Sequence, residues 1–119
     1  MLRLFVLALT ILAVPAAAQE LKLHSAGPGG AFLPYAQGLA RHLNAAGVGP
    51  AVAVETSGSI ANLAAAESEP ASLGLAFLGT AHEAVTGTGF AQGRKHTNVR
   101  ALFAMYQTSI QIAALRASG

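Results

Sequence analysis

Two loops rich in glycine and hydroxyl side chains are the part of this sequence best suited to chemistry. The first is Ser25-Ala26-Gly27-Pro28-Gly29-Gly30, and the second is Thr56-Ser57-Gly58-Ser59-Ile60-Ala61-Asn62. Each follows an apolar run typical of a strand and precedes a run typical of a helix. Backbone N–H groups at a helix start have no intrahelical partner and attract an anion or a carboxylate. The pair of loops therefore predicts one edge of the molecule that binds an anionic ligand.

The second loop carries the stronger signal. Thr56, Ser57 and Ser59 place three hydroxyls around Gly58. Asn62 follows Ser59 by about one helical turn and is expected on the same face. Because a plain helix cap needs only one of these groups, the surplus favours a ligand contact. The glycines of the first loop, taken alone, are explained equally well by a tight turn, since neither a nucleotide P-loop nor a dinucleotide-binding motif is present.

The elements that must position these loops alternate between strand and helix. Residues 21–25 and 51–55 read as strands, and the apolar run 73–78 reads as a strand buried on both faces. Helices are predicted over residues 34–44 and 79–85. This order predicts an α/β fold with a mostly parallel sheet, in which ligands bind at the carboxyl ends of the strands. Thr80 joins the two loops at that edge.

The helix after the second loop is predicted to start with Ser57 or Ser59 as its cap and to end before Pro70. Its buried stripe is expected to be Ile60, Leu63 and Ala64. Two further strands are expected toward the end of the chain, over residues 99–106 and 110–115.

Composition excludes several classes of function. The 119 residues are 53% hydrophobic and 10% charged, with a formal net charge of +2 and no cysteine. No cluster of Lys or Arg marks a nucleic-acid surface. The four histidines (His24, His42, His82 and His96) lack the spacing of a metal site, so neither metal nor cofactor is expected. No catalytic set is evident either.

The first 18 residues are typical of a cleaved secretory signal peptide. Arg3 precedes an apolar stretch that is too short to span a bilayer, and small residues follow it up to Ala18. Cleavage after Ala18 would release residues 19–119 as one exported, periplasmic α/β lobe that does not span the membrane. Because the chain stops directly after a strand-like run, we expect that lobe to be incomplete.

The chain resembles the TAXI family of TRAP-transporter solute receptors. The resemblance rests on Gly27-Pro28-Gly29-Gly30 with Pro34, Glu55-Thr56-Ser57-Gly58-Ser59 with Asn62-Leu63, Gly87-Thr88-Gly89, and Arg100-Ala101-Leu102 with Tyr106. It implies a two-lobed fold like that of periplasmic binding proteins, with this chain forming the first lobe. It also implies a small carboxylate or amino acid as ligand, such as glutamate or 2-oxoglutarate, and the permease subunits of a TRAP transporter as partners.

On this resemblance the chain is a non-catalytic receptor whose cleft wall includes residues of both loops and of the third strand's end. The expected ligand-binding residues are Gly29, Gly30, Phe32, Ser57, Gly58, Ser59, Asn62 and Thr80. The stretch Phe77-Leu78-Gly79-Thr80 departs from the polar sequence that many relatives carry there, which puts the family's side-chain contact at that point in doubt. Two alternatives remain open, namely a secreted hydrolase of small esters that uses Ser57 or Ser59 with His82, and a ligand-sensing module of a signalling protein.

Overall fold

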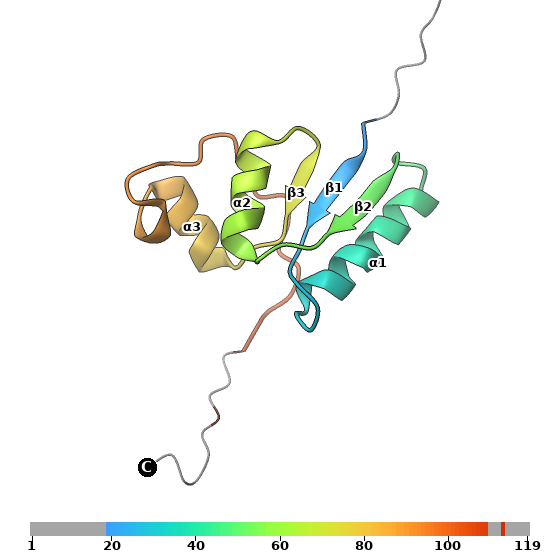
Figure 1. Ribbon diagram of the computed structural model, residues 1–119, viewed down its shortest axis with the longest axis horizontal. Coiled ribbons are helices and arrows are strands. Elements are labelled where there is room, and N and C mark those ends of the chain that lie inside the picture. The colour runs from blue at the N-terminus through green and yellow to red at the C-terminus, as the bar shows by residue number, and fades with distance from the viewer. Residues whose placement is uncertain (1–18, 110–112, 114–119) are drawn as a thin grey trace, which may run out of the picture.

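The computed structural model describes residues 19–109 and residue 113. The proposed signal peptide and the expected strand over residues 110–115 therefore lie outside the described residues, apart from Ala113. The strands are β1 (Leu21–His24), β2 (Ala51–Val54) and β3 (Ser72–Gly74). The helices are α1 (Phe32–Ala45), α2 (Ser59–Ser68), α3 (Leu78–Thr86) and the short 3-10 helix η1 (Gly89–Ala91) (Figure 1).

The three strands form one parallel sheet in the order β2-β1-β3. Leu23 in the central strand is in register with Ala53 on one side and Leu73 on the other. Parallel neighbours joined through a helix take right-handed crossovers, so a step from β1 to β2 and a return to β3 put α1 and α2 on opposite faces. The predicted α/β fold with a parallel sheet is confirmed.

The main hydrophobic core lies between α1 and the sheet. Leu23 from β1 is completely buried and packs with Phe32, Ala36 and Ala40 of α1. Alanine at two successive turns of α1 lets the helix lie close to the strands. Because side chains alternate along a strand, Leu23 faces α1 while Lys22 and His24 face α2.

The predicted buried stripe of α2 is wrong in two of its three residues. Ile60 is 52% exposed and Ala64 is exposed, whereas Asn62, Leu63 and Ala65 are buried. The polar side chain of Asn62 points to the sheet because it forms hydrogen bonds there with the Thr56 hydroxyl and with the carbonyls of residues 25 and 75. A hydrogen-bonded amide thus decides which face of this helix is buried.

The predicted third strand is also wrong over its second half. β3 ends at Gly74, and Leu78 begins α3 with 86% of its surface exposed. The chain leaves the sheet because Asn62 binds the carbonyl of Leu75 and Ser59 binds the N–H of Phe77. The helix expected over 79–85 is confirmed as α3.

Residues 99–106, expected as a strand, form no strand within the described part of the chain. Leu102 and Phe103 are exposed, while Met105 packs against the core and Tyr106 lies against Tyr35 with ring centroids 5.9 Å apart. The apolar pattern predicted sheet pairing, but no described strand pairs with this segment. Among the described helices, none has the length and apolar character needed to cross a membrane.

Candidate ligand-binding edge

Three loops meet at one edge of the sheet. The first joins β1 to α1, the second joins β2 to α2, and residues 75–77 join β3 to α3, so each follows the carboxyl end of a parallel strand (Figure 1). The N-cap residues of the three helices are Ala31, Gly58 and Phe77, and none of them forms a side-chain capping hydrogen bond. The backbone N–H groups at these helix starts are thus not consumed by their own caps.

The predicted cap of α2 is therefore wrong, because neither Ser57 nor Ser59 occupies that role. Gly58 is the N-cap, with φ 109° and ψ −157°, a conformation that is essentially restricted to glycine. The Gly58 N–H donates instead to the Thr56 hydroxyl at 3.0 Å. Only a glycine allows the chain to turn here without a steric penalty from Cβ.

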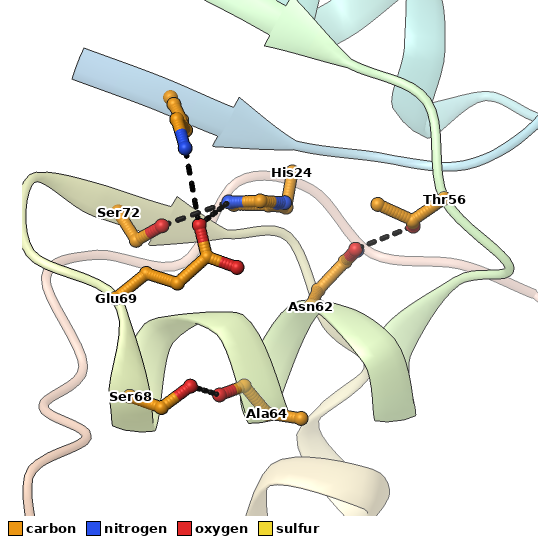
Figure 2. Close-up of polar contacts among 8 residues, drawn as sticks. His24, Thr56, Asn62, Ala64, Ser68, Glu69 and Ser72 are labelled. Carbon is orange, nitrogen blue, oxygen red and sulfur yellow. Dashed lines mark hydrogen bonds and ion pairs between the residues drawn. The ribbon is translucent and has the colours of Figure 1, made fainter. Parts of the chain in front are cut away.

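The buried side chain of Asn62 forms hydrogen bonds with all three loops. Its side chain is 0% exposed, and its amide donates to the carbonyls of Ser25 and Leu75, both at 2.6 Å. Its Oδ1 lies 2.6 Å from the Thr56 hydroxyl (Figure 2). A single side chain from α2 thereby joins all three loops, and both of its N–H donors are used inside the protein.

Ser25 and Thr56 complete this internal network. The fully buried Ser25 hydroxyl donates to the carbonyl of Val54 at 2.8 Å. The Thr56 hydroxyl lies 3.0 Å from the Ser25 carbonyl as well as close to Asn62, so its one proton is shared between two acceptors. Since these side chains are engaged with each other, they position the loops. An amide among the apolar positions of a predicted helix was the sequence signal for this network.

Ser57 and Ser59 are the hydroxyls that this network leaves for other contacts. Ser57 is exposed, and its hydroxyl forms no hydrogen bond with the described residues. Ser59 Oγ accepts the N–H of Phe77 at 3.1 Å, which ties the start of α2 to the start of α3. Its own proton has no described acceptor. Both serines can therefore donate to an anion at this edge.

The first loop presents backbone groups, and no charged side chain, at the binding edge. Gly29 is exposed with φ 89°, and Gly30 donates its N–H to the Gly27 carbonyl at 3.3 Å. Phe32 is only 7% exposed, because it packs in the hydrophobic core, and its ring also contacts Phe77 with centroids 5.1 Å apart. Phe77, at 53% exposure, is the aromatic ring that this edge presents to solvent, and sequence reasoning did not select it. Its place at the end of an apolar run was the available signal.

Thr80 lies in the first turn of α3 and is partly buried. It shares the edge with the two serines because α3 starts directly after Phe77. The structure thus brings the predicted residues of both loops and Thr80 to the edge at the carboxyl ends of the strands, with Asn62 buried behind the loops. Whether each touches a ligand stays a prediction.

A polar cluster that sequence reasoning missed lies on the face of the sheet that α2 covers. His24 is buried, and its Nε2 lies 2.8 Å from the Ser72 hydroxyl and 3.9 Å from a Glu69 carboxylate oxygen (Figure 2). The same oxygen lies 3.3 Å from the ammonium of Lys22. In a hydrolytic triad the acid and the serine bind different nitrogens of the histidine, whereas here both approach Nε2. The cluster therefore has the geometry of a structural ion-pair network.

The histidine of the hydrolase alternative lies elsewhere. His82 is exposed on α3, and its backbone carbonyl accepts the Thr86 hydroxyl at 2.7 Å. No hydrogen bond within the described residues joins the His82 ring to Ser57 or Ser59.

These features define a class of protein. A parallel α/β lobe with glycine and serine loops at the carboxyl ends of its strands has the architecture of the first lobe of a periplasmic-binding-protein-like fold. Residues 23–119 match the NMT1-like family, and the chain belongs to this family of periplasmic-binding-protein-like proteins. Searches of curated proteins and of solved structures found no match to the chain. Membership indicates a solute-binding receptor, a class that is typically extracytoplasmic.

Proposed function

We propose that the chain is the ligand-binding lobe of an exported TAXI-type receptor that delivers a small carboxylate or amino acid, such as glutamate or 2-oxoglutarate, to a TRAP transporter. The observation that carries the proposal is the meeting of three helix starts without side-chain caps at the edge that holds Ser57 and Ser59. Helix starts favour negative charge, and the two serines add hydroxyl donors. The edge therefore suits a carboxylate group.

The expected affinity of this edge alone is weak. A helix start contributes about 0.3–1 kcal/mol to carboxylate binding, and a charge-assisted hydrogen bond about 1.5–3 kcal/mol. A total of about 4 kcal/mol corresponds to a millimolar Kd. Micromolar affinity needs about 8 kcal/mol, so a second lobe that closes over the ligand would have to supply the remaining contacts. Delivery to permease subunits fits such an open-and-closed receptor.

The test is an NMR titration of the isotope-labelled chain with glutamate and with 2-oxoglutarate. We expect millimolar binding, with the largest shifts at the backbone amides of Ser59 and Leu78. Replacing Ser57 and Ser59 together by alanine should weaken binding about tenfold, because two hydroxyl donors are lost. Phe77 is exposed enough for water to take over its N–H, so the fold should survive.

Ser68→Ala is the matched control. It also removes a serine hydroxyl from α2, but that hydroxyl donates to the Ala64 carbonyl at 2.8 Å, away from the loops. The control should bind as the unmodified chain does. Equal affinity in the double variant and the control would contradict the assignment of the serines, and shifts confined to other surfaces would contradict the site.

A further inference from the structure

A hollow lies on the flank of α2, between that helix and the segment that follows α3. Its volume is about 450 Å³. Ile60 and Ala64 of α2 line it, together with Phe90 and Ala91 of η1. The polar groups at its side come from the next few residues of the chain, among them Arg94, Lys95 and His96. We call this hollow the α2 groove.

The apolar wall of the α2 groove is surface that the core does not use. Ile60, Ala64 and Glu67 recur at helical spacing along one side of α2, while Asn62 and Leu63 on another side are buried. Ile60 and Ala64, two of the three residues that the sequence marked as core, thus line a groove instead, while Leu63 is buried as predicted. Its volume falls in the range of small-molecule sites, about 300–1,000 Å³, and its apolar walls suit a compact apolar or aromatic body.

Two basic side chains at the α2 groove form no ion pair with the described residues. Arg94 and Lys95 are exposed, and neither forms an ion pair with a carboxylate of the described residues. The neighbouring acids are occupied: Glu67 accepts the N–H groups of Thr97 and Asn98 at 3.0 and 2.8 Å, and Glu83 accepts the N–H of Phe90 at 3.3 Å. Arg94 and Lys95 therefore lie beside an apolar wall without an ion pair to a described carboxylate, although Glu67 also lines the groove.

His96 adds a third donor. Its Nδ1 is buried and has no hydrogen-bond partner among the residues that the structure describes. A buried N–H without a partner is rarer than an unpartnered acceptor, so the favoured tautomer carries the proton on Nε2. The ring, which lies beside Phe90 with centroids 6.1 Å apart, can then offer that N–H at the side of the groove.

We propose that the α2 groove is a second binding site for a small amphipathic carboxylate, distinct from the serines and glycines of the loop edge. The apolar body lies against Ile60, Ala64 and Phe90, and the carboxylate is held by Arg94 and Lys95. The guanidinium of Arg94 can bind both carboxylate oxygens, which favours a planar carboxylate over a point charge such as chloride. The groove includes none of the expected ligand-binding residues of the loop edge, although Ile60 directly follows Ser59, so the proposal does not depend on the proposed function.

The probe for this site is phenylacetate, titrated into the labelled chain and followed by NMR. We expect shifts at the amides of Ala64 and His96 and a millimolar Kd. Arg94→Gln should weaken binding about tenfold, and Arg41→Gln, which removes the same charge from the exposed surface of α1, should not. Ala64→Leu should also weaken binding, because its larger side chain fills the groove without opposing the helix.

Two further measurements decide between this site and the loop edge. Phenylacetamide, which has the same body without the charge, should bind at least tenfold more weakly than phenylacetate. Excess glutamate should leave phenylacetate binding unchanged, since the two sites are separate. The proposal is overturned if phenylacetate shifts no groove amide, if Arg94→Gln and Arg41→Gln bind it equally, if the amide binds as well, or if glutamate displaces it.

Discussion

At the scale of single residues, Asn62 is the buried side chain whose hydrogen bonds connect all three loops. The functional edge consists of loops, and loops hold their geometry only where their backbone groups have partners. Asn62 supplies two such partners, at Ser25 and Leu75, and Thr56 braces its other side. The exposed hydroxyls of the edge are therefore held in place by a buried amide that need not touch a ligand.

Asn62→Ala is expected to destabilise the fold. The change leaves the Leu75 carbonyl without the Asn62 donor and leaves the Ser25 carbonyl with the Thr56 hydroxyl alone, at a cost of about 1–3 kcal/mol for an unsatisfied buried group. Urea unfolding followed by circular dichroism would measure the free energy of unfolding. Thr56→Val, which keeps the shape but removes the hydroxyl, should show a smaller loss. A stability for Asn62→Ala equal to that of the unmodified chain would contradict the supporting role.

At the scale of elements, the edge depends on how closely α2 lies on β3. A Cβ added at Gly74 would lie 2.6 Å from the carbonyl oxygen of Asn62 and 2.9 Å from its carbon, closer than real Cβ contacts come. β3 therefore requires a glycine at position 74, where the backbone of α2 lies against it. This close approach allows the short side chain of Asn62 to reach the carbonyls of two loops.

Gly74→Ala should push α2 away from the sheet and destabilise the chain by about 1–3 kcal/mol, the usual cost of overpacking. Gly38→Ala is the matched control, since its Cβ would meet only the end of the Arg41 side chain at 3.8 Å and would favour α1 by about 0.5–1 kcal/mol. Thermal unfolding of the two variants should thus move in opposite directions. A common direction would show that β3 and α2 are not in tight contact.

A second contact between elements links α2 to the segment after η1. Partial removal from water raises the pKa of Glu67, but the backbone N–H groups of Thr97, Asn98 and Val99 and the nearby His96 outweigh it and hold the pKa below its ordinary value. A carboxyl whose pKa is lower in the folded state stabilises that state above the unfolded pKa and loses this contribution as the pH falls.

The contact should therefore persist at neutral pH and weaken on acidification below about pH 4.3, the ordinary pKa of glutamate. The NMR shifts of the Thr97 and Asn98 amides, followed against pH, would report its loss. In Glu67→Gln these amides should lose their titration in that range. A midpoint above the ordinary glutamate pKa would contradict the lowered pKa of Glu67.

At the scale of the whole molecule, apolar side chains remain outside the core. Leu102 and Phe103 are exposed on a segment that pairs with no strand in the described part of the chain, although Met105 beside them reaches the core. Exposed apolar side chains on an extended, unpaired segment favour association with other chains. This surface is expected to promote self-association of the chain.

Analytical ultracentrifugation should show self-association that grows with concentration. Replacing Leu102 and Phe103 by serine should reduce it, because the apolar contact area is removed. Val48→Ser is the control, since Val48 is an isolated exposed apolar residue beyond the end of α1. A monomer at all concentrations, or an equal effect of the control, would contradict the role of this segment.

Local pattern was enough to predict much of this molecule. The alternation of strand and helix, the parallel sheet and the position of both loops at one edge follow from apolar periodicity and from glycine and proline positions, which act over a few residues. Ser57, Gly58 and Ser59 were selected as ligand-binding residues in the same way, because hydroxyls around a glycine exceed what a turn requires, and that role stays a prediction. These features depend on neighbours in the sequence and are therefore visible in it.

Tertiary contacts decided the rest. The sequence marked Ile60 and Ala64 as core and residues 73–78 as one strand, because an apolar pattern does not reveal which polar groups await a side chain across the fold. Asn62 meets carbonyls contributed by residues 25 and 75, and satisfying these buried groups outweighs the burial of a few apolar atoms. Only the folded chain brings those partners together. As a result, α2 buries Asn62 and leaves Ile60 and Ala64 in the α2 groove, and β3 ends at Gly74.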